Sequence, residues 1–308
     1  MRVVVLGAPR GLTENRWKDD IAEAAEALGW TADHIEANGA PTGDVVDLCR
    51  GADLFIWGRT HGHEPQGDAN RMLRDIEALG IPTVGIHMDL YWSIPVREPL
   101  VGADTWWSCQ YVFTADGGNQ PRFEERGVNH FWMPPAMGVR YYGLIPPPPT
   151  DRLWKVQACF VGTPGHPVHG DHRQELIAWG KKRYGAWWRL YGRSTKVYGP
   201  KLNNVYAASR FVLGDSAPSD YYWSDRVPIT LGRGGVMAYP RTVGMEQWGF
   251  NEENMVLFDR YNFAEMQEQL DSMTDKQHAD MRRAALAVVA EKHMWTHRLL
   301  QIQETVGL

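Results

Sequence analysis

Short apolar runs alternate along the chain with segments whose apolar residues recur every third or fourth position. The runs are typical of buried strands and the periodic segments of amphipathic helices. In the first 140 residues the predicted strands are 2–8, 31–37, 53–59, 81–89, 111–117 and 128–138. The predicted helices between them are 15–29, 70–80 and 120–127. This alternation favours a parallel sheet with helices on its faces, as in a Rossmann-like domain.

Four consecutive prolines interrupt this pattern within the segment 144–152 and favour a stiff, extended linker. After them the alternation begins again. The predicted strands are now 155–164, 187–193, 211–217, 235–240 and 254–260. The predicted helices are 172–185, 200–210, 224–235, 263–273 and a long closing one over 275–306. We therefore expect two α/β domains, 1–143 and 156–292, joined by a linker over 144–155, with the site in the loops that face each other.

Composition narrows the functional classes. The 308 residues are 44% hydrophobic with a formal net charge of −5, so the chain has no general basic field for nucleic acid or anionic lipid. The three cysteines stand far apart, with no CxxC pair, and indicate reduced thiols. The first apolar run is too short for a signal peptide, and no stretch approaches the roughly 18 apolar residues of a membrane span. We expect a soluble, cytoplasmic protein.

The stretch 224–235, SDRVPITLGRGG, is the most informative local motif. Ser224 is a capping residue, Asp225 lies in the first helical turn, and Arg226 points outward. Glycines 234 and 235 end the helix before the next strand. Two interpretations stay open: a plain junction between helix and strand, or a phosphate site at the start of the helix.

Several stretches resemble GT-B glycosyltransferases of the glycosyltransferase-4 type. They are TADGGNQPRFEERGVNHFWMPPAMGV in the first half, and CFVGTPG followed by HR, then VYAASRFVLGDS and SDRVPITLGRGGVMAYPRTVGMEQWG, in the second. The closing EKHMWTHRLLQI is similar to the end of the CgeB/YkvP-like, or spore-maturation-like, branch. The resemblance covers most of the chain and rests on spacing more than on a single motif.

The resemblance implies an α/β fold of the GT-B type: two Rossmann-like domains face a cleft, and a C-terminal helix, 293–308, crosses back to the first domain. It implies transfer of a sugar from a nucleoside-diphosphate sugar, with a UDP-sugar as the expected donor, retention of configuration, and no metal or other cofactor. The acceptor stays open between a glycan, a protein and a modified nucleic acid. The alternatives are a non-catalytic carbohydrate- or nucleotide-binding protein and a phage-type enzyme acting on modified DNA bases.

Two positions depart from the family pattern. The family usually has a glutamate three residues after the arginine and often another eight residues before that glutamate, and here these positions are Ile229 and Tyr221. The ribose contact then falls to Asp225 or Asp220, or the donor is held differently, or the site is degenerate. The aromatic run 221–223 is an alternative wall against the base or the sugar.

The resemblance and the strand ends together give the expected donor-site residues. They are Gly162, Thr163, Arg193, Asp215, Ser216, Tyr222, Ser224, Asp225, Arg226 and Glu246. The glycine lets the backbone approach the donor closely, and the arginines offer charge to the diphosphate. Tyr222 belongs to the aromatic run, and Glu246 matches a loop position near the sugar.

The first domain is expected to supply the acceptor side. His87 and Asp89 follow one strand and share a face, and the resemblance implies that they contact the transferred sugar and the acceptor hydroxyl. Arg10, His61 and His63 lie in two further loops and are expected to face the acceptor. The H-x-H pair also resembles a metal cluster, but no third ligand has ligand spacing. The loop 7–11 lacks the G-x-G-x-x-G spacing of a dinucleotide site.

The last helix carries an apolar stripe at three- and four-residue steps, formed by Trp295, Leu299, Ile302 and Val306. In this fold the final helix usually packs on the first domain, so we expect the stripe to face that domain and the chain to bend within 291–295.

Overall fold

The computed structural model describes residues 1–7, 17–58, 64–144, 156–165, 167–192 and 194–308. It divides into two compact units. The first comprises Met1–Pro134, Gly138–Arg140 and Trp295–Leu308, and the second comprises Pro135–Met137 and Tyr141–Met294. Within the described ranges, no helix combines the length and the apolar character that crossing a membrane requires.

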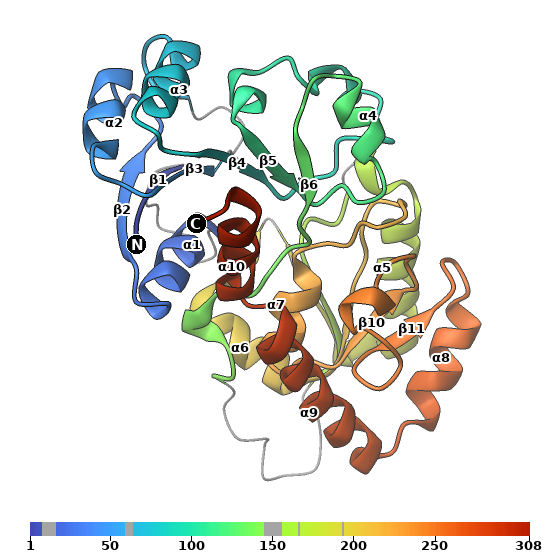
Figure 1. The fold of residues 1–308 in the computed structure, drawn as a ribbon. Helices are drawn as coiled ribbons and strands as arrows, with labels where there is room; N and C mark the ends of the chain where they lie inside the picture. Colours follow the sequence, from blue (N-terminus) through green and yellow to red (C-terminus); the bar gives the residue numbers. More distant parts are fainter. Residues whose placement is uncertain (8–16, 59–63, 145–155, 166, 193) are drawn as a thin grey trace. The chain divides into compact units, whose positions relative to one another are not determined.

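The first unit is built on a six-stranded, fully parallel sheet in the order β2-β1-β3-β4-β5-β6. Its strands are β1 (Arg2–Gly7), β2 (Thr31–Glu36), β3 (Leu54–Gly58), β4 (Thr83–His87), β5 (Tyr111–Thr114) and β6 (His130–Trp132). Its helices are α1 (Trp17–Ala27), α2 (Thr42–Cys49), α3 (Ala69–Ala78), α4 (Gln120–Glu124) and α10 (Trp295–Val306). Figure 1 shows α2 and α3 on one face of the sheet and α1 and α10 on the other. The strand order reverses between β1 and β3, the type of position at which open parallel sheets bind ligands.

Helix α2 was not predicted from the sequence. It is only eight residues long, follows Pro41, and buries no more than Val45 and Cys49, so its apolar face is too narrow to produce a clear periodicity. Those two side chains join the core formed by Val4 and Phe55 on that face of the sheet.

Helix α10 belongs to the first unit although it ends the chain. It packs against α1, and Trp295, Leu299 and Ile302 are fully or almost fully buried. Arg298 is buried beside them and donates from Nε to the carbonyl oxygen of Pro134 at 2.7 Å, which ties the helix to the segment after β6. Burial lowers the pKa of Arg298 to about 9.

A buried carboxylate organises the segment that follows β4. Asp116, two residues beyond β5, accepts hydrogen bonds from the backbone N–H of Tyr91 at 2.8 and 3.1 Å and from that of Trp92 at 3.1 Å. Burial raises the pKa of the Asp116 carboxyl to about 8, against the lowering effect of those N–H donors. The carboxylate thereby fixes the chain just after His87 and Asp89.

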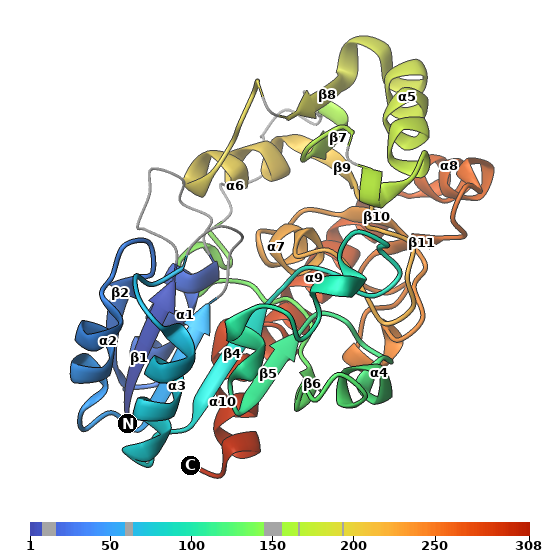
Figure 2. The ribbon, with the colours of Figure 1, turned by 90° about the horizontal axis from the view of Figure 1, so that it is seen from above.

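The second unit carries a five-stranded parallel sheet in the order β11-β10-β9-β7-β8. Its strands are β7 (Val156–Val161), β8 (Trp188–Tyr191), β9 (Ser209–Leu213), β10 (Met237–Pro240) and β11 (Val256–Phe258). Its helices are α5 (His172–Tyr184), α6 (Gly199–Ala208), α7 (Arg226–Gly232), α8 (Phe263–Ser272) and α9 (Asp275–Lys292). Figure 2 shows α5 alongside β7 and β8. Here the strand order reverses between β7 and β9.

Two helices differ from the sequence-based expectation. The helix predicted over 224–235 is only the seven residues of α7, because Ser224 and Asp225 precede it and Gly234, with φ +74°, leaves the helical conformation after it. The single helix predicted over 275–306 is two, α9 and α10, separated by His293 and Met294 within the segment where a bend was expected.

The chain enters the second unit earlier than residue 143, where the first domain was expected to end. Buried Asn203 donates from its side-chain amide to the carbonyl oxygens of Tyr141 at 3.1 Å and Leu144 at 2.6 Å, and its own oxygen accepts a hydrogen bond from Arg233. These contacts hold residues 141–144 against α6. Most of the expected linker, residues 145–155, lies outside the described residues.

We expect the α10 stripe to stabilise the first unit measurably. Leu299→Ala removes a fully buried side chain and should lower the free energy of unfolding by about 2–5 kcal/mol. The adjacent Leu300, 45% exposed, is the matched control, and Leu300→Ala should cost less than about 0.5 kcal/mol. Urea unfolding measures both variants. Equal losses would show that the stripe does not pack as described.

The buried Asp116 carboxyl should make stability depend on pH. Its folded pKa of about 8 lies above the ordinary value of 3.8, so the folded chain binds the extra proton between these values and the free energy of unfolding falls as pH rises. The advantage of the wild type over Asp116→Asn, which does not titrate, should therefore shrink from about pH 4 to about pH 8, by at most about 1.4 kcal/mol per pH unit. Urea unfolding across this range measures the difference. A constant difference would contradict the raised pKa.

Candidate functional site

A buried carboxylate surrounded by cations lies where the strand order of the second sheet reverses. Asp215, two residues beyond β9, is fully buried. Its Oδ1 is 2.7 Å from His172 Nδ1 and 3.0 Å from Arg260 Nη1, and its Oδ2 accepts from Arg173 Nε at 3.3 Å. Burial by itself raises the pKa of a carboxyl, but the hydrogen bond and charge of His172, and then the charges of both arginines, outweigh it and lower the pKa of Asp215.

The partners of Asp215 come from elements far apart in sequence. His172 and Arg173 begin α5, and Arg260 follows β11 by two residues. Arg173 is 1% exposed and also binds the carbonyl oxygens of Thr163 and Asp215, so its guanidinium is fixed in position. Burial, and then repulsion by Arg226, lowers the pKa of Arg173 to about 10, which leaves it charged near neutral pH.

Arg226 completes the group of cations, which we call the arginine cluster: Arg173, Arg226 and Arg260 around Asp215. The Arg226 guanidinium donates to the main-chain oxygen of Asp215 at 3.4 Å and lies over the ring of Phe160, as does that of Arg173. Among the described residues it has no carboxylate within salt-bridge distance. Unlike Arg173, it is partly exposed, so its charge remains available to an anion.

Gly162 makes room for this arrangement. A Cβ at this position would lie 2.7 Å from the Arg226 guanidinium carbon, and the backbone φ is +145°, so any side chain here would displace the arginine. The carbonyl of the next residue, Thr163, is held by Arg173 at 3.2 Å. Gly162 therefore admits the Arg226 side chain, and its expected role in letting the backbone approach a ligand stays a prediction.

The remaining expected donor-site residues differ in their surroundings. The Ser224 hydroxyl accepts from the Arg226 backbone N–H at 3.3 Å and donates to Asp225 at 3.0 Å. Ser216 and Tyr222 are buried, whereas Asp225 and Glu246 are exposed. Because α7 has only seven residues, the charged side chains and not the helix dipole supply most of the positive field here.

Four of the expected site residues lie outside the described residues: Arg10, His61, His63 and Arg193. Their roles stay predictions. Among the residues that the structure does describe, no three His, Cys, Asp or Glu side chains are grouped as metal ligands would be.

His87 and Asp89 lie together at the carboxyl edge of the first sheet. The His87 ring is buried, stacks on Trp106 with ring centroids 5.6 Å apart, and accepts the Asp89 N–H on Nδ1 at 3.1 Å. This hydrogen bond places the proton of a neutral His87 on Nε2. The Asp89 carboxylate is 3.5 Å from Arg97, so it is charge-paired and partly exposed.

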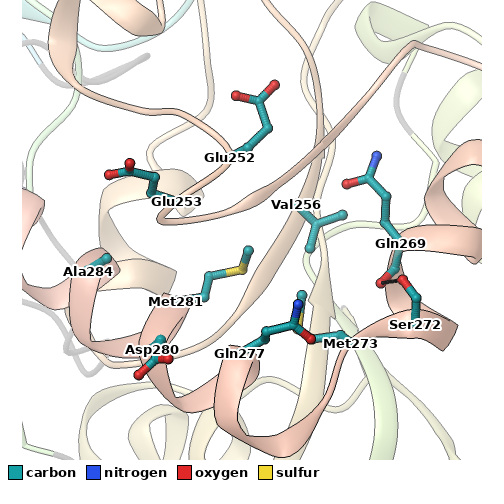
Figure 3. Close-up of a pocket in the computed structure, with 10 residues that line it drawn as sticks. All are labelled: Glu252, Glu253, Val256, Gln269, Ser272, Met273, Gln277, Asp280, Met281 and Ala284. Carbon is teal, nitrogen blue, oxygen red and sulfur yellow. Dashed lines mark hydrogen bonds between the residues drawn. The ribbon is translucent and has the colours of Figure 1, made fainter.

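Cavities in the second unit include one beside the arginine cluster and one farther from it. One of about 120 Å³ opens beside the arginine cluster at the carboxyl ends of β7 and β8, lined by Gly162, Thr163, Tyr191, Gly192, Lys196 and Tyr198 among others. The other, of about 510 Å³, is lined by residues of α8 and α9 and by Val256, the first residue of β11 (Figure 3). Two of its three carboxylates, Glu252 and Asp280, are already paired with cations.

Sequence reasoning missed His172, Arg173 and Arg260 as site residues. The first two stand in the HR pair at the start of a predicted helix, and Arg260 directly follows the end of a predicted strand. Only the pairing of β7 with β9 brings them together on Asp215. The rule that ligands meet the carboxyl ends of parallel strands was the available signal.

Residues 164–304 match the family model described as Glycosyl transferase-like. No curated protein matches the chain in sequence.

Solved structures share the fold of the whole chain. HepE from Anabaena, in complex with UDP, is 14% identical with a TM-score of 0.62, and the match covers 100% of both chains. A glycosyltransferase from Rickettsia africae is 9% identical with a TM-score of 0.65, over 99% of this chain and 98% of that one. Sucrose-phosphate synthase from Thermosynechococcus elongatus is 11% identical with a TM-score of 0.61, again over 99% and 98%. HepE has also been solved with UDP-glucose.

The two parallel sheets and these likenesses establish the GT-B fold expected from the sequence. The domain match, which includes α7 and the whole region from α5 to α10, indicates the class of enzyme. Residues 164–304 thus match a glycosyl transferase-like family model, in a chain with the GT-B fold.

Proposed function

We propose that the protein transfers a glycosyl group from a nucleoside-diphosphate sugar, with a UDP-sugar as the first candidate, to an acceptor hydroxyl. The observation that carries this proposal is the arginine cluster at the reversal point of the second sheet. Three guanidinium groups there surround one carboxylate, so the cluster has an excess of two positive charges. A diphosphate supplies the matching negative charge.

The chemistry follows from where charge develops. When the bond between the anomeric carbon and the diphosphate breaks, negative charge builds on the leaving phosphate oxygens. Arg226 is partly exposed and forms one hydrogen bond of 3.4 Å to a main-chain oxygen, so it is the cation best able to turn toward that charge. Arg173 and Arg260 are held by Asp215 and supply a fixed field.

The 120 Å³ cavity lies on the β8 side of the cluster and shares Gly162 with it. We assign this cavity to part of the nucleoside, because the nucleoside is joined directly to the phosphates. Its neighbour Ile229, which stands where the family has a ribose-binding glutamate, packs against the same apolar cluster as Val161 and Tyr191. In this proposal the ribose contact comes from another group, and Lys196, which lines the cavity, is a candidate hydrogen-bond donor.

For the first unit we propose that His87 contacts the transferred sugar through Nε2–H and that Asp89 holds the acceptor hydroxyl. The Asp89 carboxylate lies 3.5 Å from Arg97, and we assign it to orientation of the acceptor and not to proton abstraction. We keep retention of configuration and the CgeB/YkvP-like branch as parts of this proposal, on the sequence resemblance alone. Binding of a nucleotide sugar without turnover would instead favour the non-catalytic alternative.

Loss of Arg226 should weaken donor binding sharply. Arg226→Ala removes a charged partner of the diphosphate, and such hydrogen bonds are worth about 1.5–3 kcal/mol, so the Kd for UDP should rise at least about 10-fold. The control is Arg183→Ala. Arg183 is an exposed residue in the last turn of α5 and is paired with Asp271. Isothermal titration calorimetry with UDP and UDP-glucose measures both variants. Unchanged affinity in Arg226→Ala would remove the arginine cluster from the donor site.

Turnover should not require a divalent cation, because arginine side chains neutralise the leaving diphosphate in this proposal. Incubation with EDTA, followed by removal of the chelator–metal complex, should leave donor hydrolysis or transfer unchanged. The assay is release of UDP from UDP-glucose. Activity that disappears with EDTA and returns with Mg²⁺ or Mn²⁺ would contradict this mechanism.

A further inference from the structure

An exposed tryptophan stands at the edge of the second sheet that lies opposite the arginine cluster. Trp187 ends the 3₁₀ turn Gly185–Trp187, directly before β8, and is 60% exposed. The next residue, Trp188, is buried against Gly180, where an added Cβ would lie 2.6 Å from the indole ring. Because successive side chains of a strand point to opposite sides, burial of one tryptophan turns the other outward. Trp187 therefore stands at the amino end of a strand, whereas the arginine cluster lies at the carboxyl ends.

Cations flank Trp187 along the chain. Together with it they form a group that we call the tryptophan patch: Lys181, Lys182, Trp187 and Arg189. The two lysines lie in the last turn of α5, and all three cations are exposed. Within the described part of the chain, none of the three has a carboxylate within salt-bridge distance. The Arg189 Nη1 donates to the carbonyl oxygens on either side of Trp187, at 2.7 and 2.8 Å, so this guanidinium is held next to the tryptophan.

The 510 Å³ cavity offers the opposite chemistry. Apolar side chains of Val256, Met273 and Met281 line it, and Glu252 and Glu253 stand on one side of it (Figure 3). Glu252 is paired with Arg241, but the Glu253 carboxylate has no partner among the residues that the structure describes. The volume falls within the roughly 300–1,000 Å³ of ligand pockets, so the cavity has room for a tryptophan side chain.

The tryptophan patch and this cavity belong to one face of the second unit. Arg183, next to Lys182, donates two hydrogen bonds of 2.9 Å to the carboxylate of Asp271. Asp271 directly precedes Ser272, which lines the cavity. This ion pair thus joins the positive patch to the cavity with its acidic side. A face that carries two complementary parts can pair with a second copy of itself across a two-fold axis, because each part then meets its complement.

We propose that this face forms a two-fold dimer in which Trp187 of each copy enters the 510 Å³ cavity of the other. The sulfur atoms of Met273 and Met281 suit contact with an indole ring. The unpaired Glu253 carboxylate is an acceptor for the indole N–H. The cations of the patch bring positive charge to the acidic side of the cavity. Tryptophans seated in pockets are prominent among the residues that supply most of the binding energy of an interface.

The dimer leaves the donor site open. The tryptophan patch precedes β8, and Val256 in the cavity is the first residue of β11, so both parts lie at the amino ends of their strands. The arginine cluster lies beyond the carboxyl ends. This inference is therefore independent of the proposed function, and either can fail without the other.

Analytical ultracentrifugation of the full chain tests the dimer. The wild type should sediment with twice the mass of one chain. Trp187→Ala should weaken the dimer at least about 100-fold, because two anchoring contacts are lost at once. Glu253→Lys changes an exposed residue of the cavity and should weaken it similarly through charge repulsion. The matched control is Leu79→Ala, which truncates a 40% exposed apolar residue of the first unit and should leave the dimer Kd within about twofold.

Two combinations test the pairing of patch with cavity. Glu253→Lys combined with Lys181→Glu and Lys182→Glu restores opposite charges and should recover at least about 10-fold of the lost affinity. An equimolar mixture of Trp187→Ala and Glu253→Lys keeps one intact contact, because the tryptophan of the second variant meets the unaltered cavity of the first. The mixture should associate more tightly than either variant alone. Far-UV circular dichroism spectra equal to that of the wild type show that each variant folds.

The opposing outcomes are equally definite. A wild type that stays monomeric at about 100 μM, where a dimer with a micromolar Kd is almost fully formed, overturns the proposal. So does a dimer that neither Trp187→Ala nor Glu253→Lys weakens. Binding of a monomeric wild type to anionic lipid vesicles, lost in Trp187→Ala, would assign the tryptophan patch to a membrane surface and also overturn the dimer. Failure to bind UDP would refute the proposed function and leave these measurements unaffected.

Discussion

The second unit depends on one buried carboxylate. Taking the Asp215 carboxylate out of water costs several kcal/mol, which only well-placed partners offset. The partners are His172 and the arginines at 173 and 260, within 2.7–3.3 Å of its oxygens. In exchange, Asp215 holds together cations that would otherwise repel one another across the ends of β7, β9 and β11. The three guanidinium groups and the one carboxylate together carry a net charge of +2. At an effective dielectric constant of about 20, the attraction between one such positive charge and a negative charge 4 Å away is worth about 4 kcal/mol. The cluster therefore offers a favourable electrostatic field to an anion.

The fold could be predicted from the sequence because the local pattern of apolar and polar residues indicates most of its strands and helices. Buried parallel strands appear as short apolar runs, and the amphipathic stripe from Trp295 to Ile302 identified the face of α10 that is buried. The failures occurred where local signals are weak or compete. Helix α2 buries two side chains and shows no clear period, and the apolar pattern continues across the break at His293 although the hydrogen-bonded helix does not.

The site could be predicted only in part, for a topological reason. Asp215 and Arg226 were found because each lies next to a recognisable strand or helix boundary. Arg173 and Arg260 were missed because 87 positions of sequence separate them, and only the order of the strands places both on one carboxylate. Helix α7 has only seven residues, and the expected part of its N-terminus in binding a phosphate stays a prediction.

The departures from the family pattern acquire a physical meaning in this setting. Ile229 packs against the apolar cluster that contains Val156 and Leu202, so a carboxylate at that position would need water or a cation beside apolar side chains. Tyr221 does not simply replace a lost glutamate, because its backbone is held in a strained conformation that an arbitrary substitution would have relaxed. A degenerate site would be expected to lose strain and the glycine that accommodates it, yet Tyr221 and Gly244 remain in contact and the arginine cluster beside them is intact. Neither position carries a carboxylate, whereas the positive charge around Asp215 is present.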